Sequence, residues 1–137
     1  MNGKTFIDTN VLLYSVDGRD PRKQRRAREV LRTLLSESGG VISTQVLQEF
    51  YVAATRKLGI EPLVAKSLLE SFSALEVVTV DMDLIRDAID CGILNQISFW
   101  DALIVVNAAK ARCNRLWTED MNAGQTIRGV LIENPFD

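Results

Sequence analysis

The sequence contains no histidine among its 137 residues. Without an imidazole, the chain cannot build a Ser-His-Asp or Cys-His triad, or the paired histidines of a metal-free ribonuclease. A histidine-ligated zinc site is excluded for the same reason. If the protein is a hydrolase, its chemistry must therefore rely on carboxylates, which suit hard cations such as Mg²⁺ and Mn²⁺.

Cysteines and long apolar runs are also scarce. The two cysteines, Cys91 and Cys113, form no CxxC pair, and we expect buried reduced thiols and not a disulfide. No apolar run reaches the roughly 18 residues that a membrane span needs. The short apolar stretch between Lys4 and Asp8 does not resemble a signal peptide. We therefore expect a cytoplasmic protein that does not associate with membranes.

The remaining composition is that of a globular protein, with 47% hydrophobic and 25% charged residues. The length fits one domain, and the chain shows no internal repeat, low-complexity tract or linker. We therefore expect a single domain over residues 1–137.

Short apolar segments alternate with helical patterns along the chain. Asp20 and Pro21 are a typical helix start, and the residues that follow form one apolar stripe of Ala27, Val30, Leu31, Leu34 and Leu35. The patterns predict strands at 4–8, 41–43, 76–80, 116–118 and 130–132. They predict helices at 10–16, from 21 to the Gly39-Gly40 pair, at 44–57, 62–74 and 98–112, and one that Asp81 caps. This alternation favours an α/β layer sandwich with a mainly parallel sheet.

Four of the eighteen acidic residues occur where we expect a charge to be costly: Asp8, Glu49, Asp101 and Asp120. Two follow predicted strands and two lie in apolar helices that follow strands, so all four belong on one edge of a parallel sheet. Two carboxylates about 4 Å apart repel by roughly 4 kcal/mol at an effective dielectric constant near 20. A cluster of this kind must recruit cations or protons, and we expect divalent cations.

Each acid also has an ordinary structural interpretation. Asp101 lies in a strongly apolar helix start, which predicts burial, but the spacing from Ser98 also matches a capping box. Glu49 is either a solvated helix position or a partner of Arg56 and Lys57.

The two acids after strands have similar alternatives. Asp8 fits an Asx-turn or the N-cap of the helix that begins near Asn10, and Asp120 fits an ordinary turn.

Basic residues concentrate between residues 19 and 32. Seven basic side chains oppose only Asp20 and Glu29 there, a local charge of +5 against −2 for the whole chain. On a helical wheel five arginines point away from the apolar stripe: Arg22, Arg25, Arg26, Arg28 and Arg32. They form either a solvated helix face or a surface that contacts RNA phosphates or an acidic segment of a partner protein.

The four acids lie in four segments in order along the chain: 6–12 (FIDTNVL), 44–50 (TQVLQEF), 98–104 (SFWDALI) and 116–121 (LWTEDM). Together these segments resemble the motifs of the PIN-domain nucleases, and within them the VapC-type toxins of bacterial toxin–antitoxin pairs. The resemblance implies a three-layer α/β/α sandwich with a parallel sheet and RNA cleavage that depends on Mg²⁺ or Mn²⁺. It further implies inhibition by a small antitoxin protein, and often a homodimer.

On this hypothesis Asp8, Glu49, Asp101 and Asp120 hold one or two Mg²⁺ or Mn²⁺ ions and are the catalytic residues. Asp8 and Asp101 would bind metal directly, whereas Glu49 and Asp120 would act through water or orient the nucleophile. Four neighbours could orient the carboxylates, although caps and turns explain them equally: Thr9, Asn10, Ser98 and Thr118.

Three other functions remain open from the sequence. Phosphatases that resemble the haloacid dehalogenases also begin with an Asp at a strand end, but they need a second acid two residues later, where this chain has Asn10. A module of the same fold could bind RNA or a partner without cutting. The same metal chemistry could also cleave DNA.

Overall fold

In the computed structural model, which describes residues 3–137, six strands form one sheet in the order β3-β2-β1-β4-β6-β5. All neighbours pair in parallel except β5 and β6, which are antiparallel. The mainly parallel sheet predicted from the sequence is thus confirmed. The strands are β1 (Lys4–Ile7), β2 (Gly40–Ser43), β3 (Glu76–Val78), β4 (Cys113–Trp117), β5 (Thr126–Ile127) and β6 (Val130–Glu133).

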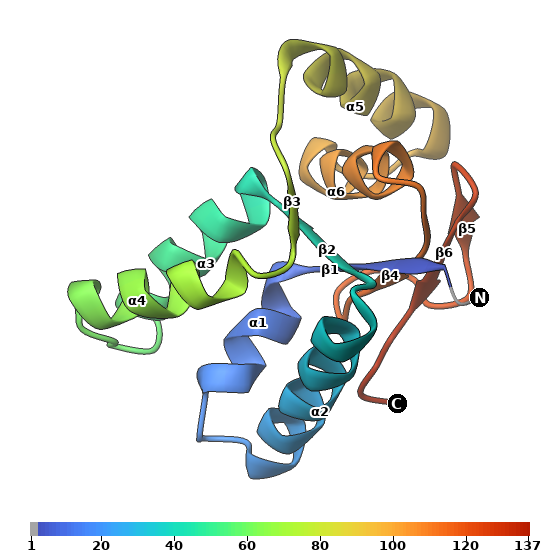
Figure 1. The fold of residues 1–137 in the computed structure, drawn as a ribbon. Coiled ribbons are helices and arrows are strands. Elements are labelled where there is room, and N and C mark those ends of the chain that lie inside the picture. The colour runs from blue at the N-terminus through green and yellow to red at the C-terminus, as the bar shows by residue number, and fades with distance from the viewer. Residues whose placement is uncertain (1–2) are drawn as a thin grey trace.

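Six helices complete the described chain, and Figure 1 shows them in layers around the sheet. Helices α5 and α6 cover one face, α1 and α2 lie on the other, and α3 and α4 pair beside the end of β2. This arrangement confirms the three-layer α/β/α class. The helices are α1 (Thr9–Val16), α2 (Pro21–Glu37), α3 (Thr44–Arg56), α4 (Pro62–Phe72), α5 (Met82–Asn95) and α6 (Phe99–Lys110).

Side-chain caps fix where several helices begin. Asp20 accepts a hydrogen bond from the backbone N–H of Lys23, with Pro21 in the first helical position, as the sequence predicts. Asp81 caps α5 in the same way, through the N–H of Leu84. These caps satisfy N–H groups that have no partner within the helix.

The core lies between the sheet and the two helical layers. Central strand residues such as Phe6, Ile42 and Leu116 are fully buried, and α6 is buried continuously from Ala102 to Ala108. At Gly40 a Cβ atom would come within 2.7 Å of the end of the Leu75 side chain and 3.1 Å of the Leu34 Cβ, so a larger residue would force these side chains to shift.

Three details differ from the sequence prediction. Strand β5 is only two residues long and was not predicted, because such a short segment has no readable periodicity. Strand β4 begins at Cys113, three residues before the predicted start. The prediction began late because Asn114 and Arg115 interrupt the apolar pattern of the strand. Leu35, placed in the apolar stripe of α2, is 46% exposed, because that stripe is buried only through Leu34.

No single helix among residues 3–137 is both long and apolar enough to cross a membrane. Helices α5 and α6 pass that test of length and composition only when taken together, as a pair bent by 115°.

Candidate active site

The strand order reverses direction at β1, which lies between β2 and β4. From β1 the chain proceeds outward through β2 and β3, and it then returns to add β4 on the opposite side of β1. Connections that diverge in this way leave a crevice outside the carboxyl ends of the two strands. Asp8 follows β1 directly, and the segment from Thr118 to Asp120 follows β4.

All four acids predicted from the sequence line one cavity of about 260 Å³ at this crevice. Asp8 comes from the end of β1 and Asp120 from the segment after β4, whereas Glu49 lies on α3 and Asp101 in the first turn of α6. The topology therefore brings together acids that lie up to 112 positions apart in the sequence.

The four acids differ in burial, which corrects the expectation that each carries a costly charge. Asp8 is 8% exposed, Asp101 is half-buried, and both Glu49 and Asp120 are exposed. Asp101 is less buried than the sequence predicts, because α6 enters the core only from Ala102 and its first turn lies at the edge of the cavity. Of the four acids, only Asp8 is buried.

Three hydrogen bonds hold the carboxylate of Asp8. The backbone N–H of Thr9 donates to Oδ1 at 2.7 Å. The Thr118 hydroxyl donates to Oδ2 at 2.7 Å, and the Asn10 side-chain amide donates to the same oxygen at 3.4 Å. Asp8 is also the N-cap of α1, so the capping interpretation is confirmed alongside its place in the cavity.

Asn10 links Asp8 to the segment after β4. Its Nδ2 donates to Oδ2 of Asp120 at 3.0 Å and to the Thr118 hydroxyl at 3.2 Å. Its Oδ1 accepts a hydrogen bond from the backbone N–H of Glu119 at 3.2 Å. The Thr118 hydroxyl in turn accepts from the N–H of Asp120 at 3.1 Å. Asn10 and Thr118 thus fix the positions of two of the four acids.

The third predicted neighbour, Thr9, donates its hydroxyl hydrogen to Oε1 of Glu49 at 2.8 Å. Glu49 forms no ion pair with Arg56 or Lys57 in the described part of the chain, so that alternative was wrong. The fourth neighbour, Ser98, caps α6 by accepting the N–H of Asp101 at 3.1 Å, as the capping interpretation predicts.

Burial raises the pKa of Asp8 from 3.8 to about 6. The hydrogen bonds from Thr118 and Thr9 lower it, but the charges of Glu49 and Asp120 raise it further. Burial also raises the pKa of Asp101, where the Ser98 hydrogen bond opposes the effect and the charge of Asp120 adds to it. Burial and neighbouring carboxylates thus keep the pKa of Asp8 high, and no cationic side chain contributes to lowering it.

A divalent cation fits this cavity by the chemistry of its donors. Four carboxylates provide only oxygen ligands, which Mg²⁺ and Mn²⁺ prefer, and a cation would offset both the burial and the neighbouring negative charges that raise the pKa of Asp8. Within residues 3–137 no three acidic or cysteine side chains are already close enough to hold a metal ion. The carboxylates of Glu49, Asp120 and Asp8 instead accept hydrogen bonds from Thr9, Asn10 and Thr118, respectively.

Sequence reasoning missed several residues that line the cavity: Leu13, Gln45, Ala53, Lys57, Trp100 and Ile104. Lys57 could have been found from its spacing, because it lies eight positions after Glu49 and thus on the same face of the helical segment. Trp100 directly precedes Asp101, but its exposure depends on how α6 meets the sheet.

The arginines of α2 divide into two groups. Arg26 donates to the backbone oxygen of Pro135 at 2.8 Å, Arg22 donates to that of Phe136 at 3.4 Å, and Arg28 donates to that of Ser15 at 2.8 Å. Arg25 and Arg32 are exposed and form no hydrogen bond or ion pair within residues 3–137. The structure thus uses part of the predicted basic surface to hold other segments of the chain.

Lys23 has a related role beside the acids. It pairs with Glu119, the residue before Asp120, and its Nζ lies 4.8 Å from the centre of the Tyr14 ring. The Tyr14 hydroxyl donates to the same carboxylate at 2.6 Å. These contacts anchor the segment that carries Asp120 against α1 and α2.

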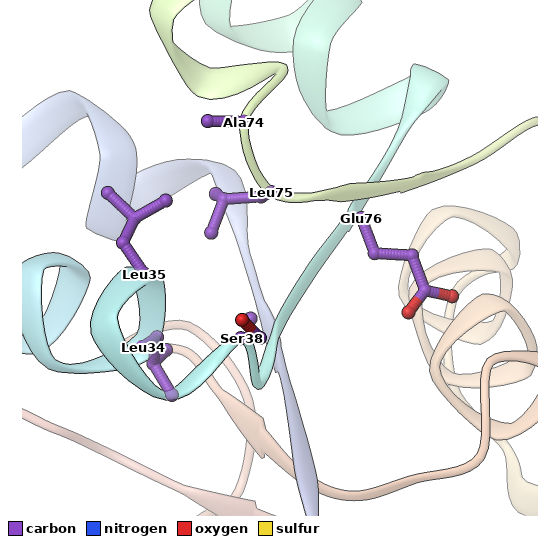
Figure 2. A pocket seen from close by; sticks show the side chains of 7 residues that line it. Leu34, Leu35, Ser38, Ala74, Leu75 and Glu76 are labelled. Atoms are coloured by element: carbon purple, nitrogen blue, oxygen red, sulfur yellow. The ribbon is translucent and has the colours of Figure 1, made fainter.

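Another cavity, of about 300 Å³, lies away from the acids (Figure 2). It is lined by Leu34, Leu35 and Ser38 at the end of α2 and by the segment from Ala74 to Glu76. In Figure 2 the Leu75 side chain points towards the end of α2, whereas the Glu76 side chain points away from it. The one charged side chain of the lining, Glu76, pairs with Lys4 at 2.8 Å. This cavity contains no cluster of reactive groups.

The model of the PIN domain family matches residues 5–126. Solved structures of similar fold include a toxin–antitoxin complex from Klebsiella pneumoniae, at 21% identity and a TM-score of 0.70, covering 96% of this chain and 98% of that one. A DNA-bound VapBC from Salmonella typhimurium has 22% identity and a TM-score of 0.70, with 97% and 98% covered.

Mycobacterium tuberculosis VapC20, described as a Sarcin-Ricin loop cleaving toxin, has 20% identity and a TM-score of 0.66, with 82% of this chain and 87% of that one covered. Comparison with curated protein sequences gives no match. The solved structures share the fold, and the family match extends from β1 into β5 and includes all four acids of the cavity. The chain belongs to the PIN domain family.

Proposed function

We propose that the protein is an endoribonuclease that depends on Mg²⁺ or Mn²⁺ and hydrolyses RNA phosphodiesters with Asp8, Glu49, Asp101 and Asp120. The observation that carries this proposal is that the four acids, from four separate parts of the chain, line one cavity at the crevice of the sheet. The raised pKa of Asp8 supports it, because a bound cation would offset the burial and the neighbouring negative charges that disfavour its ionised form.

In this proposal Asp8 and Asp101 bind the cation directly, and Glu49 and Asp120 act through water or orient the attacking water. The bound cation would supply the Lewis acid that activates water and offsets the charge of the reacting phosphate. Thr9, Asn10 and Thr118 keep the carboxylates oriented through the hydrogen bonds described above. Lys57, which lines the same cavity, adds a positive charge near the substrate phosphate.

We further propose that the protein is the toxin of a toxin–antitoxin pair, bound and inhibited by a small antitoxin, and that it forms a homodimer. The support is the similar fold of proteins described as toxin–antitoxin complexes, including a Rickettsia felis VapBC2 bound to a promoter DNA fragment. The description of VapC20 as a toxin that cleaves the Sarcin-Ricin loop supports RNA as the substrate.

A phosphatase of the haloacid-dehalogenase type agrees less well with this site. Such an enzyme needs an acid where the chain has Asn10, and Asn10 instead donates hydrogen bonds to Asp8 and Asp120. An acid at that position could not donate them when ionised.

The test is to incubate structured RNAs with the protein, with and without Mn²⁺. We expect cleavage that EDTA abolishes and that Asp8→Asn reduces by at least about a hundredfold, because removing one stabilising group commonly costs that much. Asp90→Asn, an exposed acid on α5, is the matched control and should cleave normally. Undiminished cleavage by Asp8→Asn would remove Asp8 from the site, and cleavage of only phosphomonoesters would refute the ribonuclease.

A further inference from the structure

Next to the cavity lined by the four acids lies a second one, which is larger, at about 640 Å³. Gln45, Glu49, Ala53, Lys57 and Trp100 line both cavities, which makes the second one a continuation of the candidate active site. Its other lining residues are Gln48, Val52 and Arg56, all on α3. A substrate held at the acids would therefore extend along α3 towards Trp100.

Trp100 is a large aromatic side chain that remains 61% exposed although it directly precedes Asp101. Its ring contacts Phe99 edge to face, with centroids 5.1 Å apart and planes at 75°. The backbone oxygen of Trp100 accepts a hydrogen bond from Nε2 of Gln45 at 3.4 Å. The indole thus packs against Phe99, and Gln45 holds the Trp100 backbone, while much of the residue's surface stays open.

Two cations lie on the same stretch of α3 and its end. Arg56 and Lys57 are exposed and form no ion pair within residues 3–137. Val52, 49% exposed, adds apolar surface to the lining that these cations share with Trp100. An open aromatic ring beside unpaired cations is the combination that binds single-stranded nucleic acid, because bases stack on the ring and phosphates contact the cations.

The junction of the two cavities also contains a polar atom without a partner. Gln45 is 4% exposed, and its Oε1 accepts no hydrogen bond from any group in residues 3–137. A buried acceptor of this kind normally finds a donor, from water or from a ligand. The Oε1 atom of Gln45 is therefore free to accept a hydrogen bond from a bound ligand or from water.

We propose that Trp100 is a binding residue for RNA, on which a base next to the cleaved phosphodiester stacks while Lys57 and Arg56 contact the adjoining phosphates. The proposal rests on the proposed ribonuclease function and names the form of substrate, a single strand, because a paired base offers no free face for stacking. It makes Trp100 a determinant of affinity, not a participant in bond cleavage.

The first experiment measures RNA binding without cleavage. In a Trp117→Phe background Trp100 is the sole tryptophan of the chain. A uridine octanucleotide, added in EDTA at low ionic strength, should quench the Trp100 fluorescence and give a dissociation constant. An unchanged fluorescence at saturating RNA, with binding detected by anisotropy of a labelled octanucleotide, would overturn the proposal.

The second experiment uses substitutions at Trp100. Trp100→Leu, which keeps apolar bulk without a ring, should weaken RNA binding by roughly tenfold to a hundredfold, whereas Trp100→Phe should lose less than about fivefold. Leu63→Ala removes an exposed apolar side chain of α4 outside both cavities and should bind normally. Equal losses for the Phe and Leu variants would refute stacking.

A third comparison tests the cations. Lys57→Gln should lower the dependence of binding on salt by about 0.7 in the logarithmic slope, the value for one phosphate contact with a single strand. Lys66→Gln, an exposed lysine on α4, is the matched control. The same slope in both variants would remove Lys57 from the RNA surface.

The outcomes separate this proposal from the proposed function. If Trp100→Leu cleaves RNA in Mn²⁺ with an unchanged KM, stacking is overturned but the proposed ribonuclease function still holds. The larger cavity would then be available to a protein partner. Quenching without any cleavage would support stacking and refute the ribonuclease. Equal binding of a thymidine octanucleotide would support base stacking and phosphate contacts, because neither contact involves the ribose.

Discussion

Neighbouring groups have opposing effects on the pKa of Asp8. Hydrogen bonds from Thr9 and Thr118 favour its ionised form, whereas burial and the charges of Glu49 and Asp120 favour the protonated form. The unfavourable effects dominate and raise the pKa to about 6. Ionised Asp8 therefore destabilises the metal-free fold, and a bound cation would remove that penalty.

The first prediction concerns the pH dependence of stability without metal. Below about pH 3.8 Asp8 is protonated in both states, and as pH rises towards 6 the unfolded state ionises first. The contribution of Asp8 to the free energy of unfolding therefore falls across this window. Urea unfolding in EDTA should show that the wild type loses about 2 kcal/mol more than Asp8→Asn between about pH 4.5 and about pH 7.5.

Other acids titrate in the same range, so the comparison needs a matched variant. Asp90→Asn changes an exposed carboxyl on α5 and should follow the wild-type profile. Parallel profiles for the wild type and Asp8→Asn would contradict the raised pKa of Asp8.

At the scale of secondary structure, helix α2 combines two roles that its sequence does not separate. Its arginines are all compatible with one charged face, yet Arg26 holds the C-terminal segment and Arg28 holds the end of α1. Only Arg25 and Arg32 remain without a partner in the described residues, so they are the better candidates for contacts with RNA phosphates. The distinction depends on where the C-terminal segment packs, which local periodicity cannot predict.

The second prediction follows from this division. The double variant Arg25→Gln/Arg32→Gln should keep its unfolding free energy within about 0.5 kcal/mol, as surface substitutions usually do. If both arginines contact phosphates, its logarithmic salt slope for single-stranded RNA should fall by about 1.4.

Arg26→Gln is the complementary variant. It should lose about 1 kcal/mol of stability, because the hydrogen bond to the Pro135 oxygen is lost, and it should leave the salt slope unchanged. An unchanged salt slope in the double variant would show that α2 is a solvated face.

Much of the architecture could be predicted from local sequence signals. Asp20 with Pro21 gave the start of α2, and Asp81 gave that of α5, because capping depends on neighbouring residues alone. The burial of Asp101 was overestimated, since it depends on how the first turn of α6 meets the sheet edge. A local sequence pattern predicts where a helix begins, but not which of its turns is buried against the rest of the protein.

At the scale of the whole molecule, the sheet order assembles the candidate site. The Asp8–Thr118 hydrogen bond joins residues 110 positions apart, because β1 and β4 are neighbours. The sequence predicts that acids after parallel strands meet at one edge. It does not predict that Asn10 bridges Asp8 and Asp120, or that Trp100 and Lys57 extend the cavity, since these depend on the relative placement of α1, α3 and α6.

The central claim is that the four carboxylates bind a divalent cation together. The most direct test is a titration with Mn²⁺ in which electron paramagnetic resonance measures the concentration of the free ion. We expect the wild type and Asp90→Asn to bind Mn²⁺ alike. Asp8→Asn and Asp101→Asn should weaken binding at least about tenfold, and Glu49→Gln and Asp120→Asn should weaken it less. Equal Mn²⁺ affinity in the wild type and all four site variants would contradict the account.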